Sequence, residues 1–335
     1  MSRLVPFESL PEDDRSMRLR AVRDGLIISG WLITAFVLVV VTYFGRSLGY
    51  DAYSYWSIDF ADLYGRTVAN NFGLGAFRYA PPIALLFGPL GALPWWLFVW
   101  LWLVLMLACV VWLGGRWALV LLALPPVALE LYHGNVHLLM AVAVALGFRH
   151  PWGWAFVVLT KVTPGIGLLW FAVRREWRAL AVALGATAAV SLATAVVAPH
   201  WWAEWIAATL SNLGEPQYYS VPPPLPLRLP AAAVLVIWGA RTDRPWTVPL
   251  AATLGLPIIW PHGLCVALAA VPFLRLGDQA ARQPLWRDAA DLRRLAFVTT
   301  LVLAAALIVA ALAAGPLETL LNEGSRNLDP YGRRP

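Results

Sequence analysis

The chain has 335 residues, of which 60% are hydrophobic and 13% charged, and its mean hydropathy is +0.67. A water-soluble domain needs a more polar surface than this composition provides, so we interpret the chain as an all-α, polytopic membrane protein. The formal net charge is +6, and the basic residues gather in short polar segments whose positions predict the orientation in the membrane. Cys109 and Cys265 both lie in apolar runs and indicate neither a disulfide framework nor a metal site.

The N-terminal residues 1–23 are polar and rich in arginine. The first apolar run, at about residues 26–44, begins too late for a cleaved signal peptide, so we expect an anchor with a cytoplasmic tail. The polar stretch 45–80 would then lie outside. It is longer than a usual helix connection and contains three carboxylates among aromatic residues, which together suggest an active-site loop.

Short apolar segments follow closely after this loop, and several are too short for a simple span, which predicts re-entrant or broken segments. They lie at about 81–93, 95–113, 117–132, 135–148, 151–172 and 178–198. The cluster Arg174, Arg175 and Arg178 predicts a cytoplasmic turn. A second polar loop, residues 199–228, is therefore expected outside, and it contains Gln217.

The C-terminal third has more apolar segments, at about 229–240, 246–260, 262–275 and 295–314. A basic stretch at 276–293 is expected on the inner membrane surface, and residues 315–335 form a polar tail. We therefore predict about eleven membrane segments in a single domain, residues 24–314, with outer loops 45–80 and 199–228. The sequence contains neither a dinucleotide fingerprint nor a P-loop, so ATP-driven transport has no support.

The acidic residues of the first loop are the first candidates for chemistry. Asp51 follows the first span directly, and an aspartate shielded by aromatic residues can act as a general base. The alternative is a solvated loop carboxylate, and the same alternative applies to Asp59 and Asp62. Asp59 could instead cap a short helix, and the two together could hold a divalent cation.

Lys161, the single lysine of the chain, lies about ten residues into its predicted span, where we expect Pro164 to loosen the helix and free backbone groups. A lysine in hydrocarbon is costly unless it is paired or faces a polar cavity, so it is either a functional cation or half of a structural ion pair with Glu130.

Histidines supply the remaining candidates. His133 and His137 have the i, i+4 spacing of a helical metal pair, but Gly134 interrupts that helix and no zincin motif is present, so we do not predict a metal there. His262, at an expected outer turn, could donate to an anion. The alternative is an interfacial residue with a satisfied hydrogen bond.

The order of several short motifs resembles glycosyltransferase family 87, the polyprenyl-phosphate-mannose-dependent mannosyltransferases of the GT-C superfamily. The motifs are Asp51, Leu63-Tyr64, Phe77-Arg78-Tyr79-Ala80-Pro81-Pro82, Gly134-Asn135, Lys161-x-x-Pro164 with Arg174-Arg175 and Trp177-Arg178, and Pro257-Ile258-Ile259-Trp260-Pro261-His262-Gly263. Two of them depart from the family pattern, because the glutamine of the Asn135 motif is missing and Gly263 replaces a second histidine.

The resemblance implies a membrane enzyme that transfers a hexose, most simply mannose, from a polyprenyl-phosphate sugar to a lipid-linked or glycan acceptor on the outer face. Asp51 matches the catalytic base of an inverting reaction, and Lys161, His262 and Arg78 are the cations available for the donor phosphate. Sugar or acceptor contacts are expected from Tyr53, Asp59, Asp62, Tyr64, Tyr79, Asn135 and Gln217. We expect no cofactor, no metal and no nucleic acid, and a location in the cell membrane.

Two other functions remain open. One is a carrier or flippase for a lipid or small anion, with Lys161 and Glu130 as a coupled polar pair, although the sequence shows no internal symmetry. The other is an inactive family member that serves as a subunit for envelope assembly.

Overall fold

The computed structural model describes residues 12–45, 48–70, 72–211 and 223–275, and this part of the chain is helical throughout, without strands. The all-α prediction is therefore confirmed for the described residues. The predicted inner-surface stretch 276–293, the predicted span 295–314, the C-terminal tail and Gln217 lie outside the described residues.

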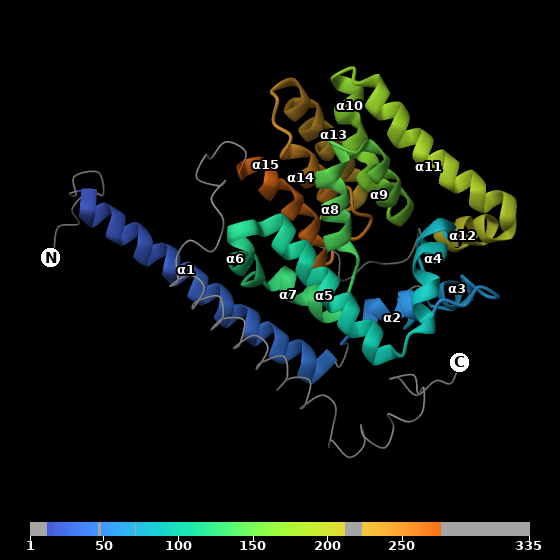
Figure 1. The fold of residues 1–335 in the computed structure, drawn as a ribbon, viewed down its shortest axis with the longest axis horizontal. Helices are drawn as coiled ribbons and strands as arrows, with labels where there is room; N and C mark the ends of the chain where they lie inside the picture. Colours follow the sequence, from blue (N-terminus) through green and yellow to red (C-terminus); the bar gives the residue numbers. More distant parts are fainter. Residues whose placement is uncertain (1–11, 46–47, 71, 212–222, 276–335) are drawn as a thin grey trace, which may run out of the picture.

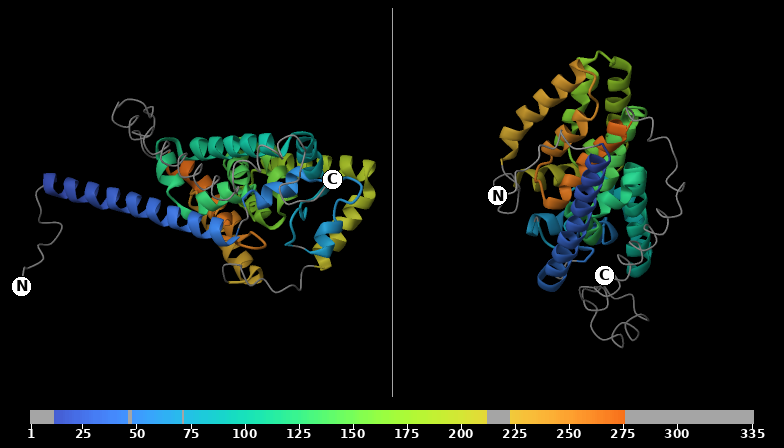
Figure 2. Two further views of the ribbon diagram at one scale, coloured as in Figure 1. Left: turned by 90° about the horizontal axis from the view of Figure 1, so that it is seen from below. Right: turned by 90° about the vertical axis from the view of Figure 1, so that its left-hand side faces the viewer.

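Three helices are long and apolar enough to cross a membrane. They are α1 (Glu12–Val40), whose candidate span is Asp24–Tyr43, α5 (Trp95–Gly114) and α11 (Trp177–Val197). The N-terminal end of α1 projects away from the other helices in the views of Figures 1 and 2. A bent pair of helices raises the number of candidate spans in the described residues to four, so about eleven segments are not confirmed.

The other elements are short and alternate with turns. In chain order they are η2 (Val41–Gly45), α2 (Tyr50–Trp56), α3 (Gly65–Ala69), α4 (Pro81–Phe87), η3 (Gly88–Ala92), η4 (Gly115–Trp117), α6 (Ala118–Leu122), α7 (Pro125–His133), α8 (His137–Gly147), η5 (Pro151–Gly153), α9 (Trp154–Thr160), η6 (Thr163–Leu168), α10 (Leu169–Val173), α12 (Pro199–Ser211), α13 (Leu225–Arg241), α14 (Thr247–Leu254), η7 (Pro261–Ala270) and α15 (Val271–Arg275).

The bent pair is formed by α7 and α8, which meet at 113°. Helix α7 begins with Pro125 in its first turn and ends at Gly134, whose φ of +70° is a left-handed conformation that glycine adopts without strain. The side chains before and after Gly134 therefore point from two differently directed helices into one region of the bundle.

The segment containing Lys161 is also broken: beyond the loosening expected from Pro164, residues 151–172 form separate short helices and not one span. Helix α9 ends at Thr160, Lys161 is extended (φ −146°, ψ 119°), and η6 begins at Thr163. The cause is Pro164, whose ring clashes with the carbonyl four residues earlier, that of Thr160. Lys161 consequently lies at a helix break and not midway along a span.

Aromatic residues form the core between α2, α4 and α5. The ring of Tyr55 lies 5.1 Å from that of Phe87 and 5.2 Å from that of Trp102, and Phe98 stacks on Trp102 at 5.6 Å. Figure 1 shows α2, α3, α4 and α12 gathered at one end of the bundle, and α12 contacts both α3 and α4. The first polar loop and the helix that follows residue 198 thus lie together.

The ends of α10 and α13 meet in another part of the bundle. Arg174 Nη1 donates to Asp243 Oδ1 at 2.8 Å and Arg174 Nε donates to Glu176 Oε1 at 2.8 Å. Both ends lie far from α2 and α3 in Figure 1. Cys109 and Cys265 are buried and form no disulfide, as their apolar surroundings predicted.

Candidate active site

Asp51 lies in the first turn of α2, and the start of this helix is held against α7. Gly49, with φ +69°, donates its N–H to the Tyr132 carbonyl at 2.8 Å, and a Cβ at Gly49 would lie 3.1 Å from the Trp95 ring. Glycine is therefore required at this point, both for the left-handed backbone and for the close approach. The contact places Asp51 beside the turn between α7 and α8.

Three polar side chains from three other segments surround the Asp51 carboxylate. Asn135 Nδ2 donates to Asp51 Oδ2 at 2.8 Å, His262 Nε2 lies 3.6 Å from the same oxygen, and Arg78 Nη2 lies 3.9 Å from Oδ1. The Asp51 side chain is 13% exposed. The structure thus joins four predicted site residues that are up to 211 positions apart in the sequence, from 51 to 262.

The pKa of Asp51 lies below its ordinary value. Burial alone raises the pKa of this carboxyl, but His262, Arg78 and His133 together with the hydrogen bond from Asn135 outweigh burial. Asp51 is therefore a carboxylate at neutral pH, which is the protonation state that a general base requires.

Arg78 is held by its surroundings while part of its guanidinium group stays accessible. Its guanidinium lies over the Phe72 ring, 5.5 Å from the centroid, and its carbonyl accepts a hydrogen bond from Trp205 Nε1 of α12 at 3.4 Å. The side chain is 30% exposed. A cation in this position can contact both Asp51 and an anionic group that enters from the open side.

The tyrosines of the loop form a buried network. Tyr64 Oη donates to the Tyr79 carbonyl at 2.8 Å, and the hydroxyls of Tyr55 and Tyr79 lie 2.8 Å apart. Burial raises the pKa of Tyr79 to about 12, so its hydroxyl stays protonated. Tyr53 is also buried, and its ring lies 5.6 Å from those of Trp56 and Trp95. These residues support the loop around Asp51.

Lys161 lies near this group without an ion pair. The Ala80 N–H donates to the Leu159 carbonyl at 3.1 Å, which brings the segment of Arg78 beside the break at Lys161. Lys161 interacts electrostatically with Arg78, Asp51 and Glu130, but among the described residues no carboxylate lies within the 4.0 Å of an ion pair. Its half-buried ammonium group is therefore available to another anion.

Two of the remaining predicted contacts are carboxylates on the surface of the first loop. Asp59 and Asp62 are exposed, and Asp59 Oδ1 accepts from the Ala61 N–H at 2.9 Å in a turn, so Asp59 does not cap a helix. Neither belongs to a group of three metal-ligating side chains in the described part of the chain. Gln217 lies outside the described residues.

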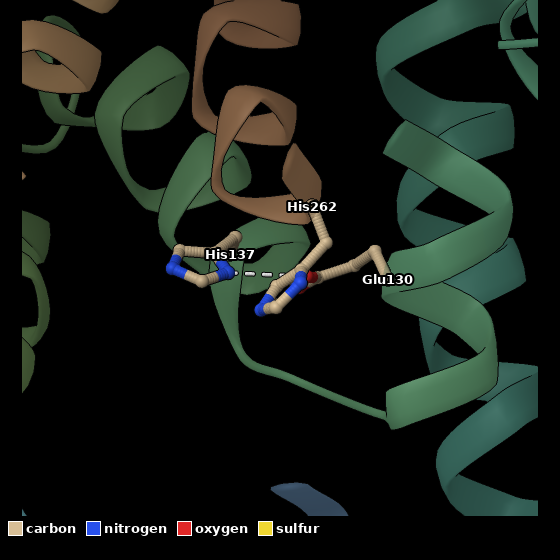
Figure 3. A group of neighbouring side chains, drawn as sticks. All are labelled: Glu130, His137 and His262. Atoms are coloured by element: carbon tan, nitrogen blue, oxygen red, sulfur yellow. Dashed lines mark hydrogen bonds and ion pairs between the residues drawn. The ribbon is translucent and has the colours of Figure 1, made fainter. Parts of the chain in front are cut away.

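Glu130 pairs with His137 and not with Lys161, which corrects the ion pair considered from the sequence. His137 Nδ1 lies 3.0 Å from Glu130 Oε2, and the Leu138 N–H donates to Oε1 at 3.2 Å. His133 and His137 do not form a helical pair, because the 113° bend at Gly134 separates them. Figure 3 shows the side chains of Glu130, His137 and His262 converging.

The sequence left several supporting residues unrecognised. Trp102 Nε1 donates to the Gly134 carbonyl at 2.8 Å and so supports the turn that carries Asn135. Arg228, on α13, donates to the carbonyls of Leu254, Leu256 and Pro257. Arg228 was the last residue of the predicted outer loop 199–228, and nothing in the sequence indicated its partners.

These observations define a membrane protein with a buried carboxylate, flanked by cations, at one end of its helices. Residues 77–304 match the model of glycosyltransferase family 87. Since this match covers more than half of the chain, the protein belongs to glycosyltransferase family 87 and is a membrane glycosyltransferase. Asp51 precedes the matched residues. No curated protein and no solved structure matches the chain.

Proposed function

We propose that the protein transfers a hexose, most simply mannose, from a polyprenyl-phosphate sugar to a hydroxyl of a lipid-linked or glycan acceptor. The observation that carries this proposal is the ionised Asp51 carboxylate, shielded from water and held by Asn135, Arg78 and His262. The resemblance of the chain to the mannosyltransferases of this family supports the choice of donor.

In the proposed reaction Asp51 accepts the proton of the acceptor hydroxyl. The acceptor oxygen forms a bond to C1 of the donor sugar on one face, while the bond from C1 to the phosphate oxygen breaks on the other, which inverts the configuration. Negative charge moves to the departing polyprenyl phosphate, where Lys161 and Arg78 would stabilise it. Burial lowers the pKa of His262 to about 4, so this residue, 3.6 Å from Asp51, would meet the phosphate as a neutral hydrogen-bond donor and not as a cation.

An apolar cavity supports a lipid-linked donor. It has a volume of about 450 Å³ and is lined mainly by residues of α4, α5, α8 and α9, among them Phe98, Trp102 and Leu146, and by Leu93 just before α5. The Tyr55 ring contacts Trp102 on the cavity wall and lies on the same short helix as Asp51. The hydrocarbon chain of a donor in this cavity would therefore end close to the carboxylate.

The proposed orientation puts Asp51 on the outer face of the cell membrane and the N-terminal tail in the cytoplasm, with residues 24–314 as one catalytic domain. Two features support it. The loop of Asp51 lies beside α12, as expected for two loops on one side, and the arginine-rich end of α10 lies far from them. Arginine is enriched in the cytoplasmic loops of membrane proteins, so the end of α10 is assigned to the cytoplasmic side.

Transfer of radiolabelled mannose from synthetic polyprenyl-phosphate mannose to membrane lipid extract tests the proposal. We expect Asp51→Asn to lower the rate by about 100-fold or more, since a general base contributes about 10²–10⁴-fold. Asp59→Asn, which neutralises an exposed carboxylate of the same loop, should keep the wild-type rate.

Other outcomes separate the alternatives. Full activity in Asp51→Asn would contradict the role of Asp51 and move the base to another carboxylate. Absence of transfer from mannose, glucose and arabinose donors alike would contradict the proposed reaction and favour the carrier or the inactive subunit.

A further inference from the structure

Glu130, His137 and His262 form a compact group behind Asp51. Each residue offers one ligand atom, and these atoms all lie within 4.8 Å of one another. The three side chains come from α7, the start of α8 and the start of η7, and they point toward one another in Figure 3. From this geometry we propose that the group binds one divalent transition-metal ion, and that zinc suits its donor set.

The donor types support zinc. Two imidazole nitrogens and one carboxylate oxygen form the ligand set of open zinc sites, in which a fourth position is left for another ligand. Tetrahedral zinc holds such atoms at about 2.0–2.2 Å, and therefore roughly 3.3–3.6 Å from one another. The present separation of up to 4.8 Å needs only a small inward movement of side chains.

The charge of Glu130 supplies an independent reason. This side chain is completely buried, and its recorded partners are His137 Nδ1 and the Leu138 N–H. No lysine or arginine of the described residues lies within ion-pair distance of it. A buried carboxylate without a strong cationic partner either binds a proton or is costly, and a divalent cation would let it stay ionised at this depth.

The two histidines have room to act as ligands. His137 is fully buried and His262 is 7% exposed, and the Nε2 atom of each is buried without a hydrogen bond. His137 would coordinate through Nδ1, the nitrogen that faces Glu130, and a proton shared between Nδ1 and the carboxylate would be released on binding. The ion would also fix the ring of His262, whose Nε2 lies 3.6 Å from Asp51.

The test is metal analysis of the full-length protein, purified in detergent without a polyhistidine tag. The protein is first treated with a chelator, then incubated with zinc chloride and desalted. We then expect about one zinc ion per chain by mass spectrometry. Glu130→Gln and His137→Gln should each lower the bound zinc at least tenfold. His150→Gln, which changes an exposed histidine outside the group, should leave it unchanged.

Two further measurements guard against misfolded variants. Zinc should raise the melting temperature of the chelator-treated wild type and not that of His137→Gln, and cobalt in place of zinc should give the visible absorption of a tetrahedral site. A monodisperse wild type that binds neither ion would overturn the proposal, as would equal zinc contents in all four proteins. Because metal content is measured without substrate, this outcome is independent of whether sugar transfer occurs.

Discussion

The side-chain amide of Asn135 makes hydrogen bonds through both its nitrogen and its oxygen. Its Nδ2 donates to Asp51 at 2.8 Å, while its Oδ1 accepts from the Val136 N–H at 2.7 Å. The second bond fixes the orientation of the amide, so the N–H group is directed at the carboxylate. Asn135 is thus a positioning residue that also stabilises the charged form of Asp51.

Asn135→Ala should therefore raise the pKa of Asp51. A base works when deprotonated, so activity falls as the pH falls through its pKa, and a raised pKa moves this acid limb to higher pH. A hydrogen bond to a charged group contributes about 1.5–3 kcal/mol, which corresponds to a shift of about one pH unit or more. The pH profile of kcat/KM measures the shift.

Asn70→Ala is the matched control, because Asn70 is exposed and its side-chain Oδ1 accepts from the Phe72 N–H within one turn. Its acid limb should coincide with that of the wild type. An unchanged acid limb in Asn135→Ala would show that Asn135 does not tune the proposed base.

At the scale of elements, Arg228 joins α13 to the segment that leads into the site. The residue is 2% exposed and donates to the carbonyls of Leu254, Leu256 and Pro257 at 2.7–3.0 Å, that is, at the end of α14 and just beyond it. These carbonyls have no partner within a continuing helix, since α14 ends at Leu254. Arg228 thereby holds the turn that reaches His262.

Arg228→Met should destabilise the protein by about 3 kcal/mol or more, because it leaves several buried carbonyls without donors. Thermal unfolding in detergent measures this as a lower melting temperature. Arg241→Met, an exposed arginine in the last turn of the same helix, should change the melting temperature little. Equal melting temperatures for the two variants would contradict the role given to Arg228.

At the scale of the whole molecule, orientation is open to direct measurement because both native cysteines are buried. In intact cells, a membrane-impermeant maleimide should label Asp59→Cys, on the loop of Asp51. It should label Arg178→Cys, beyond the end of α10, only after permeabilisation. Both positions are exposed in the structure. The reverse pattern would place Asp51 on the cytoplasmic side and contradict the proposed reaction.

Much of the architecture could be predicted because membrane insertion depends on local composition. An apolar run of about 20 residues identifies a spanning helix without any tertiary contact, and α1, α5 and α11 lie where such runs occur. The helix breaks were harder to place. Gly134 was recognised as an interruption and Pro164 as a residue that loosens its helix, but the position of the break at Lys161 depends on how Pro164 meets the Thr160 carbonyl.

The sequence by itself determined the membrane class, the long helices and the candidate residues Asp51, Arg78, Lys161 and His262, since composition and short motifs are local properties. Only the tertiary structure decided which of them meet. It placed Asn135, Arg78 and His262 around Asp51, and it paired Glu130 with His137 instead of with Lys161. The reason is physical: ion pairs and hydrogen bonds act over a few ångströms, and the chain directions set at Gly49 and Gly134 decide which side chains come within that range.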